Sequence, residues 1–170
     1  YQLMKFNTIV FVFLTSFMVA HNSAAESAES LKLQLVELPS QDIRRIALLN
    51  KLTSLYLYSE PSLSVHYAKQ VIPLAIKFED DNSRALALRL LGLAQMYQGQ
   101  NEQAVLHLTQ SINVANVIKS PHLISVSNRA MGVFYELIID YDNAMKYYIE
   151  ALKYAKLSEQ PDDLAMVYNN

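Results

Sequence analysis

The chain has 170 residues, of which 52% are hydrophobic, and its formal net charge is -2. This near-neutral charge provides no basic surface for nucleic acid, and the length suits one domain with a core or a short repeat array. The lack of cysteine excludes disulfides, thiolate metal sites and cysteine nucleophiles.

Residues 1–25 differ in composition from the rest of the chain. Lys5 precedes an apolar run, and the small residues Ser23, Ala24 and Ala25 follow it. This order predicts a secretory signal peptide, over residues 4–25 proper, that is cleaved after Ala25. The alternative is an uncleaved membrane anchor, but the run is shorter than the roughly 20 residues that a membrane span needs. We therefore expect an exported, periplasmic protein.

Residues 26–40 are predicted to be a linker or a short helix, and a repeat of fixed period follows. The sign of this repeat is that Gly92, Ala104 and Pro121 recur as Gly132, Ala144 and Pro161, so that each residue number rises by 40. A fixed period in this range is typical of stacked repeat proteins. The predicted blocks are 41–80, 81–120 and 121–160, with a truncated fourth block at 161–170.

Each block is predicted to form two helices joined by a short turn. The expected pairs are 41–58 with 62–78, 83–98 with 102–119, and 122–138 with 143–156. Asp140 or Asp142 is expected to cap the last of these helices. Pro73 lies inside the helix at 62–78 and predicts a kink or a division there.

The third block carries the pattern Met131-Gly132-x-x-Tyr135, then Asp140-Tyr141, Ala144, Tyr148 and Ala151. The second block matches it at Leu91-Gly92, Gly99, Ala104 and Leu108, with Gln95 and Ser111 in place of tyrosine and alanine. This pattern resembles the tetratricopeptide repeat (TPR). The resemblance implies an all-α, right-handed superhelix of helix-turn-helix hairpins, an alpha-alpha superhelix in which each hairpin packs on the next.

The ordinary period of that family is shorter, about 34 residues, so we expect the second helix of each block to be longer here. The first block, with Leu52-Thr53-x-x-Tyr56 and Val65-His66-Tyr67-Ala68, resembles one extended class more closely. That class is the periplasmic sensor region that precedes GGDEF diguanylate cyclases or histidine kinases.

Small residues are expected where the two helices of a block approach each other. We predict that Gly92 faces Ala104 and that Gly132 faces Ala144, with Tyr135 and Tyr148 filling the space beside this contact. A glycine inside a helix costs about 1 kcal/mol relative to alanine. Its recurrence at one position therefore indicates a packing role.

Residues that could carry chemistry are few. His66, His107 and His122 have no second metal ligand at helical spacing, so neither a metal nor a cofactor is expected. Asp80-Asp81 and Asp162-Asp163 are interpreted as charges at helix N-termini rather than as catalytic pairs. No nucleophile elbow or phosphate-binding loop is present. The chain is therefore not expected to be an enzyme, although an output domain such as a diguanylate cyclase could lie beyond residue 170.

The TPR resemblance implies a concave face, built from the first helix of each block, that holds an extended peptide. The predicted ligand-binding residues are Arg89, Leu93, Met96, Tyr97, Arg129, Val133 and Glu136, and Asn50, Ser54, Tyr58, Leu86, Leu90, Val126, Ala130 and Leu137 share the face. Arg89 and Arg129, one period apart, are expected to hold carboxylates of the peptide. The alternative is a pair of solvated arginines.

We therefore expect a protein- or peptide-binding module, the sensing or interaction region of a larger signalling protein. The partner is a protein or peptide rather than nucleic acid, and membrane contact occurs only through the signal peptide or a downstream segment. Two alternatives remain open: a structural scaffold or assembly factor for an envelope or secretion complex, and a domain that serves an enzyme elsewhere on the chain.

Overall fold

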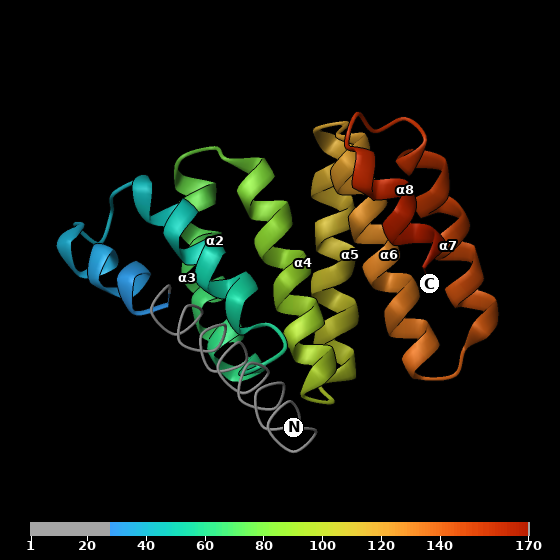
Figure 1. Cartoon of the computed structure of the whole chain (residues 1–170), viewed down its shortest axis with the longest axis horizontal. Helices are drawn as coiled ribbons and strands as arrows, with labels where there is room; N and C mark the ends of the chain where they lie inside the picture. Colours follow the sequence, from blue (N-terminus) through green and yellow to red (C-terminus); the bar gives the residue numbers. More distant parts are fainter. Residues whose placement is uncertain (1–27, 170) are drawn as a thin grey trace, which may run out of the picture. The chain divides into compact units, whose positions relative to one another are not determined.

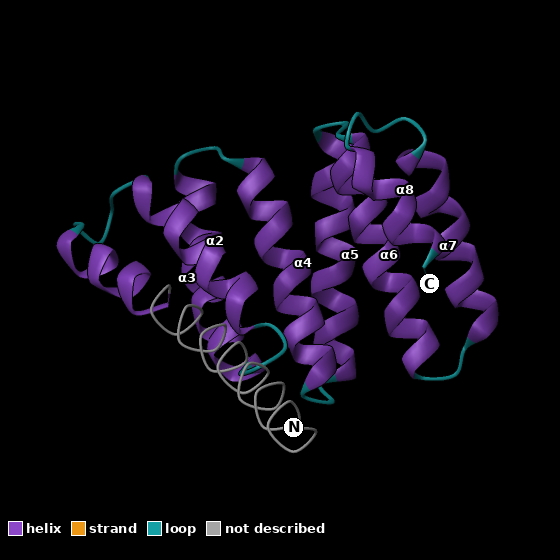
Figure 2. Cartoon of the chain, in the orientation of Figure 1, coloured by secondary structure: helices purple, strands orange, loops and turns teal. Residues whose placement is uncertain are grey.

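The structure is a computed structural model that describes residues 28–169. The predicted signal peptide lies outside the described residues. Within them, Figure 2 shows helices and connecting loops and no strand. No helix in this range has the length and apolar character that crossing a membrane requires. The chain divides into two compact units between Pro39 and Ser40, and residues 28–37 of the first unit are helical.

The second unit is a series of helices that follow one another in chain order (Figure 1). They are α2 (Arg44–Tyr56), α3 (Pro61–Lys77), α4 (Asp81–Tyr97), α5 (Asn101–Val117), α6 (Pro121–Leu137), α7 (Tyr141–Ala155) and α8 (Pro161–Tyr168). Helices α4, α6 and α8 begin one repeat period apart, and so do α3, α5 and α7. The unit is an all-α array of helical hairpins, an alpha-alpha superhelix.

Helix lengths differ from the expectation in two respects. Helices α4, α5 and α6 have 17 residues each, so the extra length of the repeat is not confined to the second helix of a block. Helix α3 is not divided: it runs from Pro61 to Lys77 with Pro73 inside it. A proline removes only one hydrogen bond of the helix ladder, and Leu74 and Ala75 after it are buried, so packing keeps the helix whole.

Helix starts are set by prolines and by short polar side chains. Pro61, Pro121 and Pro161 stand in the first turn of their helices, where a missing N–H is harmless. The carboxylate of Asp80 accepts a hydrogen bond from the Ser83 amide at 3.0 Å at the start of α4, and Asp140 accepts one from the Asn143 amide at 3.2 Å at the start of α7. Asp140, rather than Asp142, is therefore the cap of α7.

Four turns between helices share one backbone geometry. Glu79, Gly99, Lys119 and Ile139 have φ values of 55°, 72°, 52° and 63°, and they follow one another at intervals of half a repeat period. At each turn the next amide bonds the carbonyl five residues earlier, as Gln100 does to Gln95 at 2.9 Å. This is the Schellman ending of a helix, and it makes each helix-plus-turn unit the same length, so that two units fill one period.

Ile139 is the least suitable residue at these turns, because a β-branched side chain is strained at positive φ. Its side chain is 72% exposed, so little packing is lost if it is removed. We expect Ile139→Gly to raise the free energy of unfolding by about 1 kcal/mol. Urea denaturation measures this, with exposed Ile149→Gly inside α7 as a control that must be destabilising.

The glycines lie at close contacts between paired helices, as expected, and large side chains share these contacts. A Cβ added to Gly92 would lie 2.7 Å from Cγ of Leu108 and 3.1 Å from the carbonyl oxygen of Ala104. A Cβ added to Gly132 would lie 2.5 Å from Cε1 of Tyr148. Tyr148 therefore lies at the close contact, as predicted, and its ring covers Gly132 directly.

Buried serines bridge the same two helices in successive blocks. Ser111 Oγ on α5 donates to the carbonyl of Ala85 on α4 at 2.8 Å. One period later the roles are exchanged, because Ser125 Oγ on α6 donates to the carbonyl of Ala151 on α7 at 3.0 Å. Ser111 stands where the next block has Ala151, and Ala85 stands where the next block has Ser125. The serine and the alanine have therefore exchanged helices, and one hydrogen bond between the two helices is kept in each block.

Candidate functional site

The predicted binding residues come from the first helix of each block, at positions four residues apart. Residues four apart lie on one side of a helix, and α2 contacts α4 while α4 contacts α6. We call this surface the first-helix face. It comprises Asn50, Ser54 and Tyr58 of α2 and the turn after it, Arg89, Leu93 and Tyr97 of α4, and Arg129, Val133 and Leu137 of α6.

Arg89 is the most unusual side chain of this face. It is half-buried, and its Nε atom is buried with no hydrogen-bond partner among the described residues. Burial, and to a smaller extent the positive charge of Arg129, lower the pKa of the Arg89 guanidinium to about 10, against a smaller opposing effect of Tyr58. The two arginines are therefore close enough for their charges to repel, as expected from their spacing, and no carboxylate of residues 28–169 contributes to the pKa of Arg89.

Two tyrosines extend the face beyond the arginines. The rings of Tyr58 and Tyr97 lie 5.5 Å apart at an angle of 57°, and their side chains are 74% and 44% exposed. Burial raises the pKa of Tyr97, and the neighbouring Tyr58 raises it further. The pair offers exposed aromatic surface two helical turns from Arg89.

Glu136 lies on α6, about two helical turns after Arg129. The Tyr148 hydroxyl donates a hydrogen bond of 2.5 Å to Oε2 of Glu136. Burial raises the pKa of Tyr148, the Glu136 carboxylate raises it further, and the positive charge of Arg129 opposes the rise. Glu136 is thus an exposed carboxylate held by a tyrosine, close to one of the two arginines.

Other predicted site residues serve the core. Leu93 and Met96 are 6% and 3% exposed and pack in a cluster with Leu57, Leu90 and Phe134. They support the face from beneath and leave little surface to a ligand. Val133 is half-buried against the same cluster. The structural positions behave as packing residues: Ala104, Ala144 and Ala151 are buried.

A polar pair in the second block was not foreseen. His107 Nδ1 lies 2.7 Å from Oε1 of the buried Gln95. The equivalent residues one period later, Tyr135 and Tyr147, stack with centroids 5.4 Å apart and planes at 8°. Tyr56 and Tyr67 of the first block stack at 5.9 Å. The second block therefore replaces an aromatic stack by a hydrogen bond, and both of its members change together.

The environment of His107 predicts a pH dependence of stability. Burial lowers the pKa of His107, and the charge of Lys69 adds to this effect, while a backbone hydrogen bond to Gln103 opposes it. The unfolded chain therefore binds a proton first, and stability falls as pH drops below the ordinary histidine value of about 6.5. We expect the double change Gln95→Tyr with His107→Tyr to lessen the loss of melting temperature between pH 7 and pH 5. An unchanged loss would contradict this account.

A second unforeseen pair joins two blocks. His122 Nδ1 at the start of α6 lies 2.9 Å from Oδ2 of Asp163 at the start of α8, and the Asp163 side chain is fully buried. Asp163 is thus more than the exposed helix-end charge that we expected. In residues 28–169 no three histidine, cysteine or acidic side chains gather as a metal site would require.

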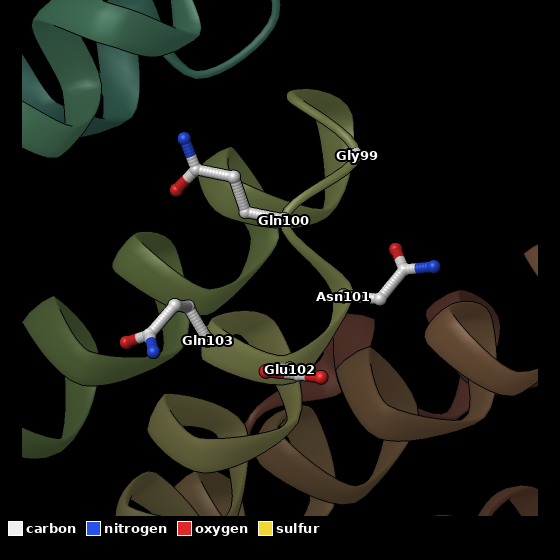
Figure 3. A pocket seen from close by; sticks show the side chains of 5 residues that line it. All are labelled: Gly99, Gln100, Asn101, Glu102 and Gln103. Atoms are coloured by element: carbon white, nitrogen blue, oxygen red, sulfur yellow. The ribbon is translucent and has the colours of Figure 1, made fainter.

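A pocket of 360 Å³ lies at the turn between α4 and α5 and is lined by Gly99, Gln100, Asn101, Glu102 and Gln103. The four side chains point in different directions, as Figure 3 shows. All five residues are exposed and consecutive in the chain, so this pocket has no convergent set of polar groups.

Known proteins resemble this chain in fold rather than in sequence. No family model matches the chain, and no curated protein does. Among solved structures, the TPR domain of Arabidopsis FLU matches with a TM-score of 0.61 and 19% identity, over 71% of this chain and 100% of that one. A Rap protein in complex with Competence and Sporulation Factor matches with a TM-score of 0.74 and 18% identity, over 90% of this chain and 44% of that one.

The apo form of RapI matches with a TM-score of 0.65 and 18% identity, over 81% of this chain and 53% of that one. The chain thus spans about half the length of the two Rap proteins. At these identities the likeness concerns the fold. This chain has a TPR-like helical-repeat fold.

Proposed function

We propose that this chain is a peptide-binding repeat module that works outside the cytoplasm as the sensing region of a larger signalling protein. The observation that carries the binding role is the pair Arg89 and Arg129 on the first-helix face, with Arg89 buried at Nε and no carboxylate of the described residues acting on its charge. A guanidinium in such surroundings gains from an anionic ligand, because charge-assisted hydrogen bonds are the strongest polar contacts in proteins.

The helical-repeat neighbours support a protein or peptide as the partner. One of them, a Rap protein, was solved in complex with Competence and Sporulation Factor, so a protein with a similar fold binds that factor. The predicted signal peptide over residues 4–25 supports export. The resemblance of the first block to sensor regions of cyclases and kinases supports the signalling context.

A scaffold or assembly factor is the second candidate, and one surface favours it. Tyr141, Met145 and Ile149 lie four residues apart on α7 and are 65%, 60% and 60% exposed. Such an apolar stripe is typical of a helix that packs against another. A purely structural role would place the partner on α7 rather than on the first-helix face.

Photocrosslinking distinguishes these two roles. Benzoylphenylalanine in place of Tyr97 probes the first-helix face, and the same group in place of Tyr141 probes α7; both tyrosines are exposed. With capped nonapeptide pools that contain one glutamate, we expect crosslinks at position 97 and none at 141. Crosslinks only at position 141 would refute the proposed function and favour assembly through α7.

A further inference from the structure

A line of polar side chains crosses the first helices of successive blocks. Arg89, Arg129 and Asn169 follow one another at intervals of one repeat period. Asn50 comes before Arg89 in the sequence by one residue less than a repeat period. Tyr58 and Tyr97 have the same offset in the sequence, and their rings are paired, so this offset brings equivalent positions of α2 and α4 together. Contacts run from α2 to α4, from α4 to α6 and from α6 to α8. We call Asn50, Arg89, Arg129 and Asn169 the polar line.

The polar line includes a buried acceptor and a buried donor that both lack a hydrogen-bond partner among residues 28–169. Asn50 is only 7% exposed, and its Oδ1, an acceptor, has no hydrogen-bond partner among residues 28–169. Arg89 Nε, a donor, is also buried and has no hydrogen-bond partner among these residues. A buried polar group without a hydrogen-bond partner destabilises the folded state. A ligand that relieves both atoms must bring a hydrogen-bond donor to α2 and an acceptor to α4.

We propose that the polar line binds an extended peptide whose middle residue is glutamate or aspartate. The proposal rests on the proposed function and adds the chemistry of the ligand. A main-chain N–H of the peptide donates to Oδ1 of Asn50, and the acidic side chain accepts from Arg89 and Arg129. Asn169 follows Arg129 by one period and has an exposed side-chain amide. This amide forms a second hydrogen bond to the main chain of the peptide.

The order of the four residues excludes the peptide's own terminus as the anion. Asparagines flank the arginine pair on both sides, so a chain that ended at the arginines would leave one asparagine unused. An amide side chain has both a donor and an acceptor, which suits the alternating N–H and C=O groups of a main chain. The carboxylate that reaches the arginines therefore belongs to an internal side chain.

The dimensions give the length of the peptide. Packed helices lie about 8–10 Å apart, so the three steps from α2 to α8 span about 24–30 Å. An extended chain covers about 3.3–3.6 Å per residue, which corresponds to about seven to nine residues. Tyr58 and Tyr97 lie eight residues beyond Asn50 and Arg89, about 12 Å along the helices. Apolar side chains of the peptide that point toward the C-terminal ends of α2 and α4 contact these two rings.

The test uses the full chain and three pools of nonapeptides that are random at the other positions. The first pool is acetylated and amidated with central glutamate, the second is the same with central glutamine, and the third has glutamine and a free C-terminal carboxylate. We expect the first pool to bind at least about 10-fold more tightly than the other two, since hydrogen bonds to charged groups contribute about 1.5–3 kcal/mol. Fluorescence anisotropy reports the affinities.

Variants separate this inference from the proposed function. Asn50→Leu should weaken binding of the first pool about 5-fold or more, whereas Asn116→Leu, an exposed amide on α5, should leave it unchanged. If the third pool binds as tightly as the first, the internal acid is refuted and peptide binding stands. If the first pool binds wild type and Arg89→Met alike, both the inference and the proposed function are refuted.

Discussion

Replacing both Arg89 and Arg129 by methionine is expected to abolish binding of acidic peptides while the array stays folded. Hydrogen bonds to charged groups contribute about 1.5–3 kcal/mol each, so losing two arginines weakens binding by about 100-fold or more. Arg84→Met is the matched control, because Arg84 lies on the same helix and pairs with Asp81 at 3.3 Å. Its loss should leave the affinity unchanged.

Removal of the Arg89 guanidinium should not destabilise the protein. The pKa of Arg89 is lowered to about 10 by burial and by Arg129, which means that the charged form, although still predominant at neutral pH, is less stable in the folded state than in water. Replacement of buried ionic groups, even paired ones, by apolar side chains of similar volume is often neutral or stabilising by about 1–4 kcal/mol. We therefore expect Arg89→Met alone to raise the melting temperature. A drop of several degrees would show that Arg89 has a structural role instead.

Replacing Gly92 by leucine is expected to lower the free energy of unfolding by about 2–3 kcal/mol. A first side-chain carbon would already lie 2.7 Å from Cγ of Leu108, which is fully buried and cannot move aside. The gain in helix propensity, about 1 kcal/mol, does not offset this overlap. Chemical denaturation with circular dichroism measures the difference.

Gly132→Leu is the informative comparison for Gly92→Leu. A Cβ added to Gly132 would meet atoms of the aromatic ring of Tyr148, and this side chain is half-buried. That ring is able to turn outward at the loss of its hydrogen bond to Glu136. We expect a smaller loss, about 1 kcal/mol, and a pKa of Tyr148 that returns toward its ordinary value. Equal losses at both glycines would contradict the packing described here.

The repeat period could be predicted from the sequence because few residue types carried it. Gly92 and Gly132, with the prolines at 121 and 161, mark the close contacts and the helix starts. The turns were harder to foresee. Glu79, Lys119 and Ile139 adopt the same left-handed conformation as Gly99, yet their side chains give no sign of it, since the hydrogen bonds of the helix end impose it.

The pairs within the site were predictable to different degrees. Gln95 and His107 occupy the positions of Tyr135 and Tyr147, so applying the repeat period to every residue would have revealed a paired exchange. The contact between His122 and Asp163 was not predictable in this way, because it joins two blocks and no equivalent pair exists one period earlier. The lack of a partner at Arg89 Nε and Asn50 Oδ1 among the described residues is a property of burial, which no sequence pattern expresses.

We propose that the first-helix face retains a half-buried arginine, Arg89, at a loss of stability, in order to bind an acidic peptide. Calorimetric titration of a capped nonapeptide pool with central glutamate into wild type and Arg89→Met tests it directly, with the melting temperature of each protein measured alongside. We predict binding to wild type, binding at least about 10-fold weaker to the variant, and a higher melting temperature for the variant. Equal binding by the two proteins would contradict the account.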